Sequence, residues 1–429
     1  MTARELLFDR NRAAVLAFEM MWGIAIPFVY YSTVVPGFLR HLGASNTWIG
    51  VGPAFHSGIV AVIQPWSAYA FRHHRGNAGW LRRVYATGAW VYVALGVAVL
   101  CGMRAPGLGI AAALLTTLLF SIATGIGDPH YMDLVVSAAP PVLRGRFFGL
   151  RVVFLGLGGI VGGVLAEQLL KVAPVPMNYG VSFVVGGLLY VASTQALHAC
   201  RRAQPVQEPH VEEHPDTFAR FLRENLLPLA ARPQFRKFLS AAVIYALAVA
   251  VFPFLSLLIR ERLHAGEEIL GLLGGLVMAA NLIFSWLLGA LCDRFGSRTS
   301  FGVVLIGYIG GLLLCLTLTE RTGLLLAYFL TAIWMPGLFV PVTNLALELA
   351  ARDPERPATA AESTSLLMAA MSPGRIMGPI AVGAALDRLP VTAVFIAAAG
   401  LACISLTILT CSTGRDALKS SKATRGTRR

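Results

Sequence analysis

Apolar residues occur in long runs along this sequence, and short polar segments separate one run from the next. A helix needs about 20 apolar residues to cross the hydrocarbon core of a membrane. Twelve runs reach this length, at 14–38, 47–71, 84–103, 108–137, 147–170, 179–199, 236–259, 269–292, 299–319, 324–349, 363–386 and 391–412. The pattern predicts an all-α membrane protein with twelve transmembrane helices.

The composition strengthens this prediction. Charged residues make up 13% of the chain and hydrophobic residues 56%, whereas soluble domains carry roughly 25% charged residues. The first apolar run is too long for the hydrophobic part of a signal peptide, and no A-x-A-like cleavage site closes it. We therefore interpret it as the first membrane helix.

One long polar segment, residues 201–234, divides the twelve runs into two sets of six. We predict an N-terminal six-helix bundle at 1–200, a C-terminal bundle at 235–412 and a basic tail at 413–429. Apolar residues at helical spacing in 216–231 predict an amphipathic helix within the linker.

The two halves contain a weak internal repeat. Segments that align in the same order are LGASNTWIG (42–50) with LHAGEEILG (263–271), GLGGIVGG (156–163) with SPGRIMGP (372–379), and Pro129 with Pro341. Two pseudo-symmetric six-helix halves are a transporter architecture, in which the solute binds between the halves near the middle of the membrane.

The net charge of +13 does not indicate nucleic-acid binding, because the basic residues follow the predicted topology. With a cytoplasmic N-terminus, 26 of the 35 Lys and Arg residues lie on the cytoplasmic side, seven outside and two within spans. This excess predicts that both termini are cytoplasmic. Arginine far outnumbers lysine, which is typical of a GC-rich bacterial genome, so we expect a bacterial inner membrane.

The segment GALCDRFGSR (289–298) follows the eighth run and has the form G-x-x-x-D-R-x-G-x-R. Its glycines permit a tight turn and close helix approach. Asp293 can lie at the N-terminus of a neighbouring helix, where partial positive charge favours it. The candidate gating residues are Gly289, Asp293, Arg294, Gly296 and Arg298 in this segment, and Arg146 and Arg151 in PPVLRGRFFGLR (140–151).

With twelve spans, a central polar linker and this loop motif, the sequence resembles the major facilitator superfamily over nearly its whole length. The resemblance implies two bundles that alternate access to a central site. Ser297 departs from the family motif, and Arg72 stands where the first half would carry the counterpart of Asp293. GRIMGP (374–379) is similar to a motif associated with antiporters but lies in the eleventh span, so we do not infer antiport.

Ionisable side chains inside the predicted spans are candidate functional residues, since each costs at least about 2.5 kcal/mol at a helix centre unless it faces a cavity or a partner. The segment GIGDPHYMD (125–133) holds three of them. The candidates for proton or cation binding are Glu19, Asp128, His130 and Asp133. An ion pair of Asp133 with Arg151 is the structural alternative. A divalent metal site is disfavoured, and we predict none.

Arg375 is the deepest basic residue, and it needs either an anionic solute or an acid as partner. In the family fold, the eleventh span borders the second, which carries His56 and Gln64. Other candidates for lining the cavity are Tyr30, Tyr31, Asn281 and Trp334. Each of these could instead be an ordinary hydrogen-bonding residue between helices.

The sequence thus predicts a monomeric secondary transporter in the lipid bilayer that moves a small solute by alternating access, coupled to protons. Nucleotide-binding and hydrolase motifs are absent, so we expect neither an enzyme nor a cofactor. Two alternatives stay open. One is a facilitator without ion coupling, and the other is a receptor or assembly factor on the same scaffold that transports nothing.

Overall fold

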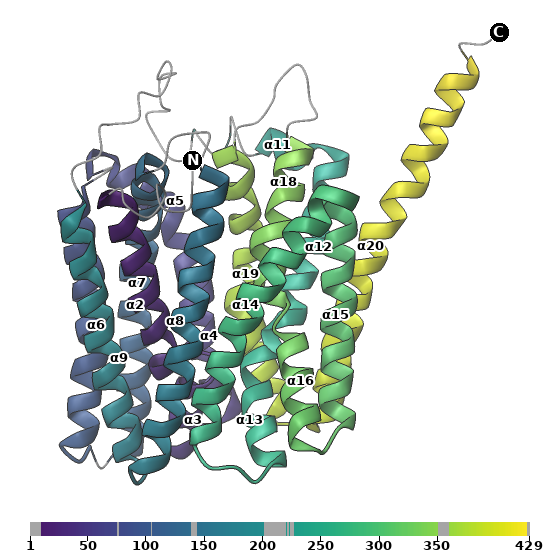
Figure 1. Cartoon of the computed structure of the whole chain (residues 1–429). Coiled ribbons are helices and arrows are strands. Elements are labelled where there is room, and N and C mark those ends of the chain that lie inside the picture. The colour runs from purple at the N-terminus through teal and green to yellow at the C-terminus, as the bar shows by residue number, and fades with distance from the viewer. Residues whose placement is uncertain are drawn as a thin grey trace.

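The computed structural model describes residues 10–74, 77–103, 105–138, 144–200, 227–350 and 360–426, together with the single residues 220 and 223. All regular structure within these ranges is helical, and the helices stand side by side in two bundles (Figure 1). Eleven helical stretches are long and apolar enough to cross a membrane. The chain is an integral membrane protein with an all-α fold, as the hydropathy pattern predicted.

Each half of the chain forms one bundle. The first consists of α2 (Arg10–Val29), α3 (Val34–His41), α4 (Asn46–Ala54), η1 (Phe55–Ile59), α5 (Val60–Ala70), η2 (Arg72–His74), α6 (Ala78–Leu100), α7 (Pro106–Ala138), α8 (Arg144–Val172), α9 (Met177–Ala196) and η4 (Leu197–Ala199). The second follows α11 (Leu227–Ala231) and consists of α12 (Pro233–Ala248), η6 (Val249–Val251), α13 (Phe252–Arg262), α14 (Glu268–Phe295), α15 (Ser297–Thr317), α16 (Arg321–Thr331), α17 (Trp334–Gly337), η7 (Leu338–Val342), α18 (Thr343–Ala350), α19 (Ala360–Leu386) and α20 (Val391–Gly426).

The second predicted span is not among these eleven stretches, because its mean hydropathy is lower. His56, Ser57 and Gln64 make it more polar than the other runs. The elements α4, η1 and α5 nevertheless form one continuous helical segment from Asn46 to Ala70. At 1.5 Å per residue this segment is roughly 37 Å long, enough to cross a bilayer. It therefore supplies the twelfth membrane helix of the fold.

The start of α2, the end of α20 and the short helix α11 lie at the same end of the bundles, which we call the linker side (Figure 1). The opposite end, where α3 and α13 terminate, is called the far side. Of the predicted amphipathic helix, the structure describes α11 and two single residues, and the rest lies outside the described residues. The last helix continues to Gly426, beyond the boundary predicted at 412.

The first helix of each half is interrupted at the same level. The break between α2 and α3 covers Tyr30–Thr33, and that between α12 and α13 is the 3-10 turn Val249–Val251. The alignment of residues 42–50 with 263–271 places residue 30, the first of its break, opposite residue 251, the last of the turn, so the two interruptions are adjacent in the repeat and overlap at this position. Ser256 of α13 donates a hydrogen bond of 2.9 Å to the Ser32 carbonyl oxygen, which the break has freed. The internal repeat is therefore visible in the backbone.

The two bundles pack directly against each other along two pairs of helices, α8 with α14 and α4 with α19. Glycines make these contacts possible. A side chain at Gly163 would collide with the backbone of Gly275, and one at Gly50 with the carbonyl group of Pro379. Such close backbone approach is typical of helix pairs in membranes. These contacts lie in the far-side half of the interface.

Candidate functional site

A buried ion pair joins the first and fifth spans. The Glu19 carboxylate in α2 accepts a hydrogen bond of 2.6 Å from Nε of Arg151 in α8, and Nη2 of Arg151 lies closer still. Tyr131 of α7 donates its hydroxyl hydrogen to the same oxygen of Glu19 at 2.6 Å. The side chains of Glu19 and Arg151 are 5% and 14% exposed, so the pair is shielded from water.

The pairing of Arg151 differs from the sequence-based alternative, in which Arg151 would neutralise Asp133. Arg151 instead pairs with Glu19 of the neighbouring helix α2 and lies over the ring of Tyr131, 5.1 Å from its centroid. Tyr131 therefore contacts both members of the pair. Arg151 is the ion-pair partner of Glu19 in this conformation.

Asp128 has a different environment. Its carboxylate accepts hydrogen bonds from the amide of Gln64 in α5 at 3.0 Å and from the hydroxyl of Tyr85 in α6 at 2.9 Å. Both donors are neutral, and no cation pairs with Asp128 in the part of the chain that the structure describes. The side chain is half-buried. A carboxylate held in this way can keep its hydrogen bonds whether it is ionised or protonated.

His130 and Asp133 complete the candidates on α7. His130 is 2% exposed, and its Nε2 lies 3.4 Å from the Ser67 hydroxyl. Its ring meets the edge of Trp80, with 4.9 Å between centroids. Asp133 lies nearer the linker side and is half-buried. His130 therefore packs between α5 and α6, inside the first bundle.

Arg375 lies in the middle of α19, where this helix crosses the second span. The Ser57 hydroxyl is 3.3 Å from the Arg375 carbonyl oxygen, and Gly58 packs against Ile376. The positive charge of Arg375 acts on the nearby side chains of Tyr31 and His56. The rings of Tyr31 and His56 stack, with 4.0 Å between centroids. The structure thus brings together residues of the first, second and eleventh spans.

The remaining cavity candidates are more dispersed. Tyr30 packs edge-on against Tyr31, with 4.8 Å between ring centroids. Trp334 belongs to the second bundle, where its ring meets Phe252 and its carbonyl oxygen accepts a hydrogen bond from Tyr245 at 2.7 Å. Asn281 is 7% exposed within α14. Of this set, Tyr31 is the one that stacks on His56 of the second span, next to Arg375, and Tyr30 contacts Tyr31.

The loop motif forms the turn between α14 and α15. Gly296 has a φ of 84°, a left-handed conformation that favours glycine. Ser297 donates a hydrogen bond of 2.5 Å to Glu348 of α18. Arg298 donates to the carbonyl oxygen of Leu409 in α20. The motif therefore ties three helices of the second bundle together on the linker side.

The charged residues of the loops do not bridge the two bundles in this conformation. Asp293, Arg294 and Arg146 are exposed and make no ion pair with any residue whose position is described. Gly289 has open space around it. Contacts of Asp293 with a neighbouring helix, expected for a closed linker side, are absent from the described structure.

The far side is held closed by polar contacts between the bundles. Asp387, which follows α19, accepts hydrogen bonds from the backbone N–H groups of Asn46 at 2.8 Å and Thr47 at 3.0 Å. Glu267, which precedes α14, pairs with Arg260 at 2.6 Å and accepts a hydrogen bond from the Tyr179 hydroxyl of α9. These contacts join α4 to α19 and α9 to α14.

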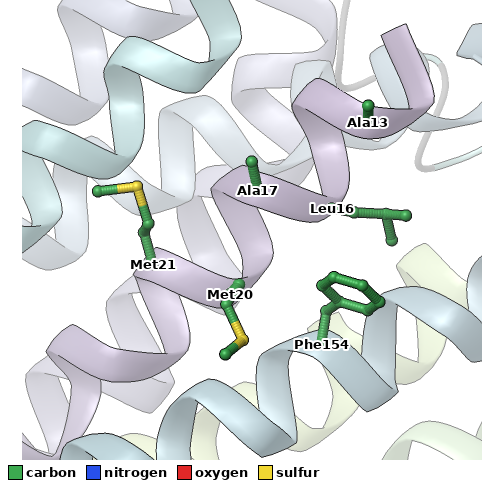
Figure 2. A pocket seen from close by; sticks show the side chains of 6 residues that line it. All are labelled: Ala13, Leu16, Ala17, Met20, Met21 and Phe154. Atoms are coloured by element: carbon green, nitrogen blue, oxygen red, sulfur yellow. The ribbon is translucent and has the colours of Figure 1, made fainter. Parts of the chain in front are cut away.

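An apolar hollow of about 350 Å³ lies between α2 and α8. Figure 2 shows Leu16 and Met20 of α2 beside Phe154 of α8 at its edge. Phe154 is two residues to the linker side of Gly156, where α8 still touches Leu282 of α14. The hollow therefore lies in the linker-side half of the first bundle.

Sequence reasoning missed several residues of these networks. Tyr85 and Tyr131 were not singled out, although Tyr131 belongs to the segment GIGDPHYMD. Asp387 was also missed, because its partners lie about 340 positions away in the chain. Gln64 could be recognised from the sequence, because it is a polar residue in the second span, which we expect next to the eleventh.

Comparison with known proteins agrees with this architecture. The family model described as Major Facilitator Superfamily matches residues 238–428. No curated protein matches the sequence. Solved structures match nearly the whole chain at low sequence identity, so they establish the fold alone.

Three of these structures illustrate the similarity. The nucleoside transporter NupG has a TM-score of 0.66 at 12% identity, over 94% of this chain and 98% of its own. A bacterial homologue of the iron transporter ferroportin in an inward-facing state has a TM-score of 0.65 at 15% identity, over 94% and 98%. A bacterial homologue of the human lysosomal transporter Spinster, inward-facing and unoccupied, has a TM-score of 0.62 at 16% identity, over 94% and 95%.

Residues 238–428, in the second half of the chain, match the family model of the major facilitator superfamily, and this half carries the loop motif at 289–298. The chain as a whole is a membrane protein whose fold of two six-helix halves is similar to that of the solved transporter structures.

Proposed function

We propose that this protein is a secondary transporter that moves a small solute by alternating access and couples the movement to protons at Asp128. The observation that carries the proposal is the contrast between two acids in the first bundle. Glu19 is neutralised by Arg151, whereas Asp128 is held by the neutral donors Gln64 and Tyr85. Intramembrane acids without a cationic partner are typical of proton relays.

Asp128 can take up and release a proton without a large rearrangement. When ionised, it accepts from Gln64 and Tyr85. When protonated, its own hydroxyl becomes a donor, and the Gln64 side chain also carries an acceptor oxygen. Glu19 lacks this freedom, because protonating it would leave the Arg151 charge buried without a counterion. We therefore assign the coupling role to Asp128 and a structural role to Glu19.

The arrangement of contacts supports an inward-facing conformation. The bundles are joined on the far side by Asp387 and Glu267, and glycines allow close packing there. The apolar hollow and the exposed Asp293 lie on the linker side. The excess of basic residues on the linker side supports a cytoplasmic location for that side. Rocking of the bundles would open the far side and bring Asp293 toward a neighbouring helix.

The experiment uses the purified full-length chain in liposomes loaded with a pH-sensitive dye. Organic anions, cations and neutral solutes are added outside one at a time, and exchange of each radiolabelled solute is measured in parallel. We expect one solute class to drive proton movement in wild type. Asp128→Asn should abolish this movement and retain solute exchange, and Glu320→Gln, which alters an exposed acid on the far side, should behave as wild type.

Each other outcome selects an alternative. Solute-driven proton movement that survives in Asp128→Asn removes Asp128 from the coupling mechanism. Solute exchange without proton movement in wild type identifies an uncoupled facilitator. Failure of every solute to exchange leaves a receptor or assembly factor and contradicts the transport proposal.

A further inference from the structure

Arg375 is a cation without a counterion inside the membrane region. Nη1 of the guanidinium lies 3.7 Å from the sulfur of Met368, and a thioether is a weak hydrogen-bond acceptor. No carboxylate of the described residues pairs with it. An arginine at the centre of a membrane helix costs several kcal/mol unless it meets water and a counterion. The chain itself does not supply that counterion, so the solute is the remaining source.

The residues around Arg375 come from both bundles. Ser57 of the first bundle lies 3.3 Å through its hydroxyl from the carbonyl oxygen of Arg375, and Gly58 allows Ile376 to approach closely. His56 directly precedes Ser57, and its ring stacks on Tyr31 with 4.0 Å between centroids. A ligand bound here would touch both bundles at once, as a solute must in alternating access.

The local backbone of the second span is unusual at this point. Phe55–Ile59 form the π-helix η1 inside an otherwise α-helical span, and π-turns occur frequently at functional sites. His56 belongs to this turn, and its ring lies flat against Tyr31. The stacked pair offers a planar aromatic surface beside the guanidinium.

An unsatisfied donor lies close to the same place. The hydroxyl of Tyr328 in α16 is buried and has no hydrogen-bond partner among the described residues. The ring of Tyr328 stacks on Phe252 with 5.1 Å between centroids, at the start of the helix whose Ser256 donates to the Ser32 carbonyl oxygen. A buried hydroxyl without a partner is destabilising, and an acceptor oxygen of a ligand would satisfy it. Arg375 needs a negatively charged group and Tyr328 needs an acceptor, and a ligand with anionic oxygens supplies both.

We propose that Arg375, Tyr31 and His56 form the binding site for a small organic anion with a flat apolar body; this inference deepens the proposed transport function and rests on it. The guanidinium fork matches a carboxylate or phosphonate group with two parallel hydrogen bonds. The stacked rings of Tyr31 and His56 contact the body of the anion. The unpaired charge of Arg375 repels cations, which gives the site its selectivity.

The test compares ligands that share one ring and differ in charge. Thermal stability and calorimetric binding of the purified full-length protein are measured with benzoate, phenylphosphonate, benzyl alcohol and benzylammonium. We expect the two anions to bind and raise the melting temperature. Arg375→Gln should weaken anion binding about 10- to 100-fold, since hydrogen bonds to charged groups contribute roughly 1.5–3 kcal/mol. Arg375→Lys should recover part of the affinity, because it restores charge but not the two-pronged geometry.

The control is Arg388→Gln, which removes an exposed arginine on the far side and should leave anion binding unchanged. Arg375→Gln removes an unpaired charge, so we expect it to fold and to remain testable. Equal anion binding by wild type and Arg375→Gln would overturn the proposal. So would failure of both anions to bind wild type.

The experiment separates this inference from the transport proposal. Anion binding that depends on Arg375, in a protein that exchanges no solute in liposomes, would support the site and contradict transport. Exchange of benzyl alcohol or benzylammonium by a protein that binds neither anion would support transport and overturn the anion site.

Discussion

Asp387 caps a helix of the opposite bundle. Its carboxylate accepts hydrogen bonds from the N–H groups of Asn46 and Thr47 in the first turn of α4, and from the Thr47 hydroxyl at 2.7 Å. Ser45, the residue that precedes α4, makes no capping bond with its side chain. A carboxylate at this position satisfies free N–H groups and interacts favourably with the helix dipole. The cap of α4 is therefore supplied by the second bundle.

The second half of the chain has a carboxylate at the corresponding position, although its side chain does not cap α14. Asn46 aligns with Glu267, the residue that precedes α14. Glu267 pairs with Arg260 and accepts a hydrogen bond from Tyr179 of the first bundle. Both far-side closures thus place a carboxylate at the start of the second span of each half. In one half this carboxylate belongs to the repeat, and in the other it comes from the opposite bundle.

Removing the carboxylate of Asp387 should weaken the closure of the far side. Loss of a helix cap costs about 1 kcal/mol, which corresponds to a roughly fivefold shift in a conformational equilibrium. We expect Asp387→Ala to speed hydrogen exchange at the amides of Asn46 and Thr47. Glu320→Gln, the exposed-acid control, should leave that exchange rate unchanged. Unaltered exchange in Asp387→Ala would show that the cap does not hold the far side closed.

Acid should weaken the same contact. Slight burial raises the pKa of Asp387, but hydrogen bonds from Thr47 and Asn46 outweigh this effect, so its pKa lies below the ordinary value of 3.8. A lowered pKa means that the stabilisation is complete above the ordinary value and is lost as pH falls through the lowered one. Protection of the α4 amides, corrected for intrinsic exchange, should be constant from pH 5 to 8 and fall below about pH 4. Asp387→Asn should abolish this acid dependence, and its persistence would assign the effect to another group.

The pair of Glu19 and Arg151 should behave as one structural unit. Glu19→Gln leaves the Arg151 charge buried without a counterion, so we expect a loss of about 3–5 kcal/mol in the free energy of unfolding. Tyr131→Phe removes a single hydrogen bond to Glu19 and should cost about 1 kcal/mol. The double variant Glu19→Gln with Arg151→Met should recover much of the loss. Thermal and denaturant unfolding in detergent measure these differences, and additive effects of the two substitutions would disprove the coupling.

Because α8 and α14 are in close contact at glycines, a larger side chain at this contact should change the conformation of the protein. A valine at Gly163 would collide with the backbone of Gly275, so Gly163→Val should force the far side apart. Spin labels at Val172 and Leu389, two exposed far-side positions, would report a longer distance. Gly310→Ala is the matched control, because Gly310 faces open space. An unchanged distance in Gly163→Val would mean that the closure tolerates the added volume.

The sequence was a good guide to the fold because membrane helices are determined locally, by length and hydropathy. The internal repeat, although weak in sequence, aligns the start of the break at Tyr30–Thr33 with the end of the turn at Val249–Val251. Polar candidates could be selected from the sequence because a charge such as Arg375 is conspicuous in an apolar run, and their functional roles stay predictions. Their pairing could not be predicted. Arg151 pairs with Glu19 and not with Asp133 because helix packing in three dimensions, rather than proximity along the chain, decides which charges meet.

Paired distances across the two ends of the molecule test alternating access. Spin labels at Val172 and Leu389 report the far side, and labels at Gly149 and Phe295, both exposed, report the linker side. We predict a short far-side distance in the unliganded protein. On addition of a solute that the protein exchanges, or in Asp387→Ala, the far-side distance should lengthen while the linker-side distance shortens. Distances that stay constant, or that lengthen and shorten together, would contradict alternating access in this protein.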